Sequence, residues 1–200
     1  MNPAEAIDKL NCYDIILASE SPRRKHLMAE LGLKFRVESN MGMDEVYPSV
    51  LKASEIPVYL ARAKAAWNDN LIGSNTLLIT ADTIVWLGNE VIGKPVDLPD
   101  AITMLTRLSG NMHEVFTGVC IKSAFNETVF QVSSRVFFRK LSPDEIQYYV
   151  GKYKPLDKAG AYGIQEWIGY VGVERIEGSY YNVMGLPVQR LYCELLKFIE

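Results

Sequence analysis

The chain has 200 residues, of which 48% are hydrophobic and 22% are charged, and its formal net charge is −3. This composition can bury a full core, and the charge argues against a protein that binds nucleic acid or membranes through a basic surface. No apolar run reaches the roughly 20 residues of a membrane span, and residues 1–10 lack the apolar stretch of a signal peptide.

Helices and strands alternate along the chain. Strands are predicted at 14–19, 35–38, 77–86, 115–123, 128–139 and 170–176. Helices are predicted at 21–31, 54–68 with Ser54 as N-cap, 99–109, from Ser142 with Glu145 completing a capping box, and 187–199, with loops at 41–52 and 158–165. Because the late strands adjoin through a hairpin at 125–127, we expect an α/β fold with a mixed, twisted sheet.

Basic residues fill the first turn of the first predicted helix, at 23–25. Unpaired backbone N–H groups already make that helix end positive, so an anion should compensate these side chains. The hydroxyls of Ser19 and Ser21, with the guanidinium groups of Arg23 and Arg24, would suit phosphate oxygens. The alternative is a solvated basic helix start with Ser21 as its cap.

Asp82 interrupts the otherwise apolar run at 79–85. A carboxylate in such a strand must be paired, bound to a metal or placed at a cleft. The alternative is a strand-end aspartate that hydrogen-bonds a turn. Thr83, next in the chain, could act as a cap or face a ligand.

Lys64 lies on the apolar stripe of the helix predicted at 54–68, four residues after Leu60 and three before Trp67. Such a lysine either extends its ammonium to the surface or points into a polar cleft. Its position alone favours the first alternative.

Two glycine-containing turns supply further candidates. Lys94 lies in the stiff turn 93–95, where it either binds phosphate or is solvated. Gly160 and Gly163 permit close approach of a ligand to the backbone, and Gln165 ends the stretch with an amide that both donates and accepts. The alternative is a surface loop that ends in an ordinary glutamine.

Cysteine and histidine usage limits the metal chemistry. Cys12, Cys120 and Cys193 are odd in number and far apart, which favours reduced, buried thiols in the cytoplasm. With His26 and His113 as the sole histidines and no CxxC, a zinc site is disfavoured, and any metal should be a hard ion bound by oxygen. The sequence also lacks GxxxxGK[ST], GxSxG and GxGxxG motifs.

Taken together, the motifs resemble the Maf family of nucleoside triphosphate pyrophosphatases over about residues 15–195. LASESPRR resembles the family's signature LASxSPRR, and ADT followed by GKP resembles its central motifs. LSGNMHEVFTGV is similar to its LSGxxHxVxTxV segment, and GSYYNVMGLP to its closing motif. DKAGAYGIQ resembles the branch that acts on dTTP and UTP rather than on 7-methyl-GTP.

The resemblance implies one domain over 1–200, with residues 1–13 as an extension, and an elongated two-lobed α/β fold with a deep central cleft. The inosine triphosphatase group has such a fold. It also implies a cytoplasmic homodimer that uses Mg²⁺ or Mn²⁺. The implied reaction converts dTTP, UTP and related pyrimidine nucleotides, modified ones included, to the nucleoside monophosphate and pyrophosphate.

Residue roles follow from the same resemblance. Asp82 is the expected catalytic base, and Arg23, Thr83 and Gln165 fall at the family's specificity positions. We expect a metal ion held by Asp82, Glu45 and phosphate oxygens.

The remaining basic residues are expected to act on the phosphates. Lys64, Lys94 and Arg24 would neutralise phosphate charge as it shifts during the reaction. Two alternatives stay open: the same fold acting on 7-methyl-GTP or other non-standard nucleotides, and a nucleotide-binding regulator of septum formation without catalysis. In each case the partner is a nucleotide, with neither nucleic acid nor a membrane.

Overall fold

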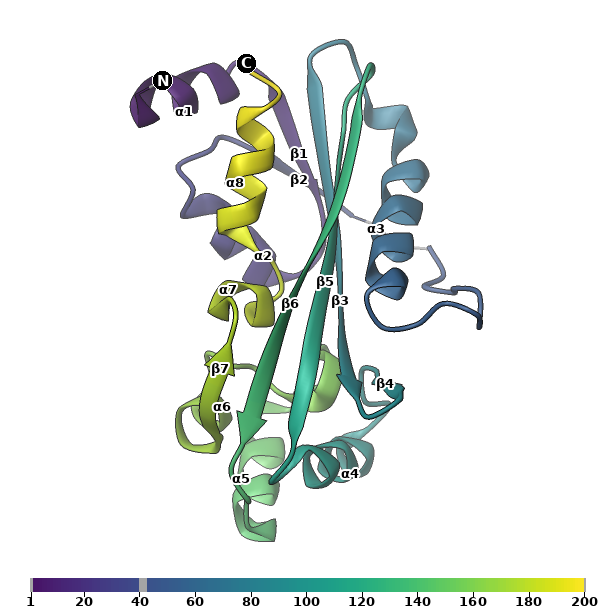
Figure 1. Ribbon diagram of the computed structural model, residues 1–200, viewed down its shortest axis with the longest axis vertical. Helices are drawn as coiled ribbons and strands as arrows, with labels where there is room; N and C mark the ends of the chain where they lie inside the picture. The colour runs from purple at the N-terminus through teal and green to yellow at the C-terminus, as the bar shows by residue number, and fades with distance from the viewer. Residues whose placement is uncertain (1, 40–42, 200) are drawn as a thin grey trace. The chain divides into compact units, whose positions relative to one another are not determined.

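The computed structural model describes residues 2–39 and 43–199 (Figure 1). Its strands are β1 Asp14–Ala18, β2 Arg36–Glu38, β3 Thr76–Leu87, β4 Glu90–Ile92, β5 Met112–Lys122, β6 Glu127–Phe138 and β7 Val173–Glu177. They form a seven-stranded sheet in the order β2-β1-β3-β5-β6-β7, and β4 pairs with β3. β1 runs parallel to β2 and β3, whereas β4 is antiparallel to β3 and β7 to β6. The predicted α/β class with a mixed sheet is therefore confirmed.

Side-chain caps explain four of the eight α-helix starts in the described part of the chain. The helices are α1 Pro3–Leu10, α2 Pro22–Ala29, α3 Glu55–Trp67, α4 Leu98–Leu108, α5 Pro143–Tyr153, α6 Trp167–Gly172, α7 Tyr180–Met184 and α8 Val188–Leu196, with short 3₁₀ helices η1 Asp69–Leu71 and η2 Ala159–Ala161. Ser142 and Glu145 form the predicted capping box of α5. The prediction of Ser54 as a cap is wrong, because its backbone is already helical and its side chain makes no capping bond. The Glu55 carboxylate accepts the Lys52 N–H there instead.

The chain folds into two compact units. The first comprises residues 1–82, 117–132 and 185–200, and the second comprises 83–116 and 133–184. The strands β3, β5 and β6 contribute residues to both units.

The first unit packs helices on both faces of its strands (Figure 1). α3 lies on one face, where Ala61 and Ala65 pack against Ile16, Leu78 and Cys120 in a buried cluster. Alternation along β1 and β3 gives each strand a second buried set of side chains on the opposite face, where α2 and α8 lie.

The N-terminal extension also belongs to this first unit. Residues 3–10 form α1, which a capping box between Asn2 and Glu5 begins and which buries Ala6 and Leu10. The Tyr13 hydroxyl donates to the Phe198 carbonyl at 3.0 Å, so the extension is joined to the end of the chain beside α8.

The second unit has its own apolar core. α4 and α5 pack on each other, and the fully buried Leu105, Leu108 and Tyr149 join Val85 and Val136 of the sheet. This core supports the glycine-containing loop at 158–165, part of which forms η2.

One predicted element limit and one expected burial are wrong. Residues 170–176 were predicted as a strand, but α6 extends to Gly172 and β7 starts at Val173. A Cβ on Gly169 would lie 1.9 Å from the Ile164 carbonyl oxygen, so glycine lets α6 start close against the residue five positions earlier. Trp67, placed on the buried stripe of α3, is 54% exposed because α3 ends there.

Candidate active site

The turn from β1 into α2 carries two serine hydroxyls. Ser19 is buried, and its Oγ accepts the Ser21 N–H at 3.3 Å and an Arg24 Nη1–H at 3.4 Å. Ser21 Oγ accepts the backbone N–H of Arg24 at 3.4 Å, so Ser21 caps α2. Each hydroxyl keeps its own hydrogen, which can be donated to a ligand oxygen. Arg23 is half-buried beside them, and its charge contributes to a lowered pKa of Arg24.

Arg24 folds back from α2 toward the middle of β3. Its Nη1 donates to the Ala81 carbonyl at 2.8 Å, and its Nε donates to the Gly185 carbonyl at 2.8 Å. Burial lowers the pKa of the Arg24 guanidinium, while the charges of Asp82 and Glu45 raise it. The compensation that the basic helix start requires therefore comes in part from the protein's own carbonyls and carboxylates.

The Lys64 ammonium joins two carboxylates. Its Nζ donates to Asp82 Oδ1 at 2.5 Å and to Glu45 Oε1 at 2.7 Å. The side chains of Lys64 and Asp82 are 7% and 9% exposed, whereas that of Glu45 is 43% exposed. Lys64 thus points inward rather than to solvent, and Asp82 has the partner that a buried carboxylate requires.

Close packing of α3 on the sheet sets the position of Lys64. The Thr80 hydroxyl, two residues before Asp82, donates to the Ala61 carbonyl of α3 at 2.6 Å. On β5, a Cβ on Gly118 would lie 2.3 Å from the Pro57 carbonyl oxygen, so glycine there brings the helix backbone onto the strand. The first contact holds α3 one turn before Lys64, and the second holds the helix near its N-terminus. Together they leave the lysine little freedom to move.

Three of the predicted residues belong to the second unit. Thr83, half-buried, directly follows Asp82. Lys94 is exposed in the turn after β4, and this turn is joined to η2 because the Gly160 N–H donates to the Gly93 carbonyl at 2.9 Å. The two glycine-containing turns identified in the sequence are therefore hydrogen-bonded to each other.

Gln165 is the third of these residues. Its side-chain oxygen Oε1 is buried, and it has no hydrogen-bond partner among the residues that the structure describes. Buried amide groups are nearly always paired, so an orphaned one suits a ligand that supplies the missing partner.

Sequence reasoning missed three polar side chains around this loop, of which Tyr149 and Lys158 are buried. Tyr149 of α5 reaches the backbone of Gly163, and Glu166 and Lys158 form an ion pair at 3.2 Å. Lys158 begins the loop predicted at 158–165, and Glu166 directly follows it. The presence of opposite charges at those ends was a usable signal for their pairing.

The metal site expected from Asp82 and Glu45 is the least complete feature. Across residues 2–39 and 43–199, no group of three or more His, Cys, Asp or Glu side chains could hold a metal ion. The two carboxylates nevertheless converge on the single Lys64 ammonium, and their oxygens are the donors that Mg²⁺ prefers. They fit a divalent cation that takes its other ligands from substrate phosphates and water.

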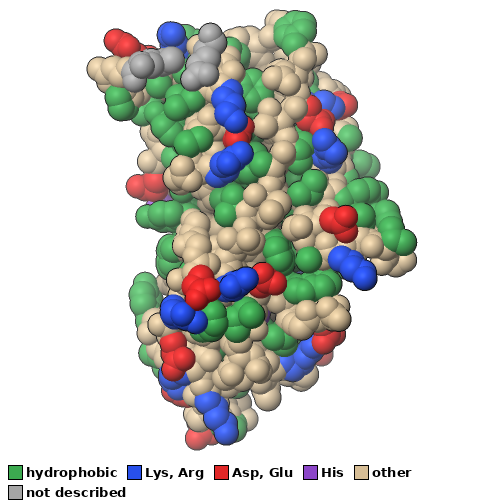
Figure 2. All heavy atoms as spheres, in the orientation of Figure 1, with side chains coloured by type: hydrophobic (Ala, Val, Ile, Leu, Met, Phe, Trp, Pro, Cys, Tyr) green, Lys and Arg blue, Asp and Glu red, His purple; other side chains and the backbone are tan. Residues whose placement is uncertain are grey.

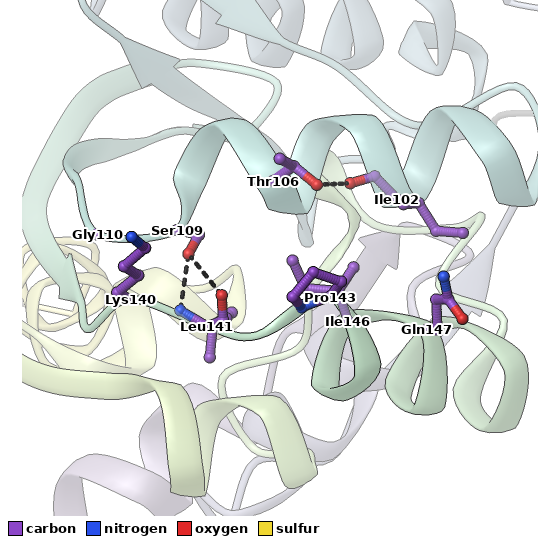
Figure 3. Close-up of a pocket in the computed structure, with 9 residues that line it drawn as sticks. All are labelled: Ile102, Thr106, Ser109, Gly110, Lys140, Leu141, Pro143, Ile146 and Gln147. Atoms are coloured by element: carbon purple, nitrogen blue, oxygen red, sulfur yellow. Dashed lines mark hydrogen bonds between the residues drawn. The ribbon is translucent and has the colours of Figure 1, made fainter.

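A separate hollow lies in the second unit between α4 and α5 (Figure 3). Its volume is about 480 Å³, and the residues that line it are Ile102, Thr106, Ser109, Gly110, Lys140, Leu141, Pro143, Ile146 and Gln147. The Ser109 hydroxyl, just after α4, accepts the N–H of Leu141, just before α5, at 2.7 Å. The lining includes none of the predicted site residues.

Three expectations from the composition concern surface charge, membrane-spanning helices and cysteine burial. On the face drawn in Figure 2, acidic and basic side chains are intermixed. Among the described residues, no helix combines the length and the apolar character needed to span a membrane. Of the three cysteines, Cys120 is buried as expected, but Cys12 and Cys193 are exposed.

Comparison with known proteins shows the family to which the chain is related. The chain matches the Maf-like protein family over residues 14–198. It is 54% identical over 191 residues to a dTTP/UTP pyrophosphatase of Phocaeicola vulgatus, which covers 96% of this chain and 99% of that protein. It is 48% identical over 182 residues to a dTTP/UTP pyrophosphatase of Flavobacterium psychrophilum, covering 91% of this chain and 93% of that protein.

Among solved structures, the chain is similar to the Ham1 protein of Staphylococcus aureus. The two are 16% identical with a TM-score of 0.49, covering 92% of this chain and 99% of that chain. The match to the family extends over most of the chain, and the two relatives described are 54% and 48% identical over more than nine-tenths of it. The chain belongs to the Maf family.

Proposed function

We propose that the protein is a nucleoside triphosphate pyrophosphatase that hydrolyses dTTP and UTP to the monophosphate and pyrophosphate. The observation that carries this proposal is the buried pair of Asp82 and Lys64, with Glu45 on the same ammonium. Its relatives in Phocaeicola vulgatus and Flavobacterium psychrophilum, named dTTP/UTP pyrophosphatases, support the choice of substrate.

In the proposed reaction, a water molecule attacks the α-phosphorus. A bond forms from the water oxygen to phosphorus, and the bond from the α-phosphorus to the bridging oxygen breaks, so that pyrophosphate leaves. Asp82 orients the water and accepts its proton. Lys64 holds one oxygen of that carboxylate at 2.5 Å, which fixes the direction of the other.

Positive groups of the chain stabilise the charge that moves toward pyrophosphate. Lys64, Lys94 and Arg24 are assigned to this task, with the Ser19 and Ser21 hydroxyls as additional donors. Arg24 acts here through its charge, because two of its N–H groups already hold the Ala81 and Gly185 carbonyls. Arg23 stays assigned to specificity, together with Thr83 and Gln165.

A divalent cation, Mg²⁺ or Mn²⁺, is assigned to Asp82 and Glu45. When bound, it would lower the pKa of the attacking water and neutralise phosphate charge. The base is assigned to Gln165, with Thr83 beside the catalytic carboxylate. One amide can pair with two adjacent groups on a uracil or thymine edge, whose pattern is acceptor, donor, acceptor.

The experiment is a panel of nucleoside triphosphates at equal concentration, with pyrophosphate release measured in the presence and absence of Mg²⁺. We expect metal-dependent release from dTTP and UTP well above that from CTP and 7-methyl-GTP. Binding of nucleotide without products would instead indicate a regulator, and preference for 7-methyl-GTP would indicate the other branch.

Two further expectations accompany this function. The protein should be a homodimer, which light scattering coupled to size exclusion tests directly. It should act in the cytoplasm, where reducing conditions keep its three thiols free. Localisation of a tagged full-length chain tests the second point.

A further inference from the structure

Gln165 occupies the third position of a tight turn. The Glu166 N–H donates to the Gly163 carbonyl at 3.0 Å, which closes a four-residue turn over 163–166. The side-chain oxygen of Gln165 is buried and orphaned, so its direction depends on the backbone of this turn rather than on a bond of its own.

A single hydroxyl holds both ends of that turn. Tyr149 is fully buried in α5, and its hydroxyl oxygen accepts the Gly163 N–H at 3.0 Å. The same hydroxyl donates its hydrogen to Glu166 Oε2. Burial, together with the hydrogen bond to Glu166, raises the pKa of Tyr149, so the hydroxyl keeps the hydrogen that it donates.

The Glu166 carboxylate is fixed at its other oxygen as well. Lys158 Nζ lies 3.2 Å from Glu166 Oε1 and donates to Asp157 Oδ1 at 2.7 Å. A Cβ on Gly163 would lie 2.7 Å from Glu166 Cδ, so glycine at this position leaves the space that the carboxylate occupies. Both oxygens of Glu166 are therefore held, one by a buried phenol and the other by a buried ammonium.

We propose that Tyr149, Glu166 and Lys158 are positioning residues for base selection, which act by holding the turn that presents Gln165. The inference rests on the proposed function and adds to it the groups that make the amide selective. An amide discriminates between pyrimidines only if its donor and acceptor stay within a fraction of an ångström of the base edge. A hydroxyl bonded to both ends of the turn restricts it in this way.

A purely structural role for Tyr149 makes a different prediction. Loss of a buried hydrogen bond would then lower stability and reduce activity toward every nucleotide by the same factor. Loss of positioning changes the ratio between nucleotides, because phosphates carry no base identity. The ratio of kcat/KM for dTTP to that for CTP therefore separates the two roles.

The test is Tyr149→Phe, which removes the hydroxyl and keeps the ring. We expect the dTTP-to-CTP ratio to fall at least about fivefold, the low end for a buried polar group left unpaired. Inhibition by pyrophosphate, which has no base, should stay within about twofold of the wild type. Tyr148→Phe is the matched control, because this neighbouring hydroxyl is exposed and accepts a bond from Lys152.

A double-mutant cycle with Gln165→Ala makes the assignment specific. If Tyr149 acts through Gln165, then Tyr149→Phe changes the dTTP-to-CTP ratio no further in the Gln165→Ala background. Glu166→Gln serves as a second variant in case Tyr149→Phe does not fold. It retains an acceptor for Tyr149 but loses the ion pair to Lys158, so the ratio should fall by less.

The outcomes of the cycle are distinguishable. If Gln165→Ala lowers the ratio while folded Tyr149→Phe leaves it unchanged, the positioning role is wrong and base reading by Gln165 stands. If Gln165→Ala itself leaves the ratio unchanged, base reading by Gln165 is wrong and the inference fails with it. If the wild type releases no pyrophosphate from any nucleotide, the proposed function fails first.

Discussion

Arg24 Nη1 donates to the carbonyl oxygen of Ala81 at 2.8 Å, so α2 holds the backbone immediately before Asp82. Its Nε holds the Gly185 carbonyl at the same distance. A guanidinium has donors in a fixed planar fork, whereas a lysine ammonium is a compact point charge on a flexible stem. Arg24 can therefore contribute through geometry as well as through charge.

Arg24→Lys should separate these contributions. We expect it to lose kcat/KM for dTTP, UTP and CTP by a similar factor, and to lower the free energy of unfolding by about 1–3 kcal/mol because a buried carbonyl loses its donor. Thermal unfolding and pyrophosphate release measure the two effects. Arg24→Ala, which removes the charge and the fork together, is the comparison, and full activity of Arg24→Lys would show that charge alone matters.

Lys64→Met should destabilise the fold through Asp82. The substitution keeps an unbranched side chain one atom shorter but leaves the buried Asp82 carboxylate without its closest cation. Removing one partner of a buried pair costs about 3 kcal/mol or more. Adding Asp82→Asn to Lys64→Met should recover much of that loss without recovering activity, and denaturant unfolding of both variants measures it. Equal stability of the two variants would contradict the coupling.

Asp82→Asn alone should abolish most catalysis while preserving shape. We expect kcat to fall at least about 100-fold, the low end for removal of a general base. Nucleotide binding, followed by calorimetry with dTTP, should be largely retained. Turnover like that of the wild type in this variant would remove Asp82 from the role of base.

Burial should make His113 a source of acid sensitivity. The imidazole is 1% exposed between the rings of Phe138 and Tyr162, its Nε2 lies 2.7 Å from the Tyr162 hydroxyl oxygen, and burial lowers its pKa from 6.5 to about 4. Between these two values the unfolded chain binds the proton and the folded chain does not. The contribution of the neutral His113 to the free energy of unfolding is therefore fully present above pH 6.5. It is lost as the pH falls toward 4, by about 3 kcal/mol in total.

Denaturant unfolding at pH 7.5, 5.5 and 4.5 measures how steeply the free energy of unfolding falls as the pH falls, which is called the slope below. His113→Phe removes the titrating group and should flatten the slope between pH 6.5 and 4, whatever its own stability at pH 7.5. His26→Gln, on an exposed histidine of α2, is the control. An unchanged slope in His113→Phe would show that another group causes the acid sensitivity.

Much of the candidate site was predictable because its signals are local. Ser21 before a proline marks a helix start by backbone capping alone, and the structure has that cap. An aspartate inside an apolar strand needs a partner, and that requirement was visible in the sequence. The sequence did not identify the partner, because the position of Lys64 alone favoured an ammonium at the surface, and the 2.5 Å contact depends on how α3 packs on the sheet.

Other features depend on contacts that no local pattern encodes. Tyr149 and Glu166 are 17 residues apart, and nothing in the periodicity of α5 marks that hydroxyl as the partner of a turn. The start of β7 was predicted too early because Tyr170 and Val171 have strand propensity, which the packing of Gly169 on Ile164 overrides. The partners of Arg24 were unpredictable for the same reason, since Gly185 lies 161 residues away.

Gln165→Glu tests whether the orphaned amide reads the base. A carboxylate in place of the amide turns a donor into a negative acceptor, so one pyrimidine carbonyl would face an oxygen instead of an N–H. Such an unsatisfied buried contact costs roughly 1–3 kcal/mol, or about 5- to 150-fold in kcat/KM. Activity toward dTTP and UTP should both fall, and activity toward CTP should fall less because cytosine offers an amino donor at one edge position. Gln147→Glu, on an exposed glutamine of α5, is the matched control for added negative charge. If the dTTP-to-CTP ratio is the same in Gln165→Glu as in the wild type, Gln165 does not read the base, and the preference for thymine and uracil must come from other residues.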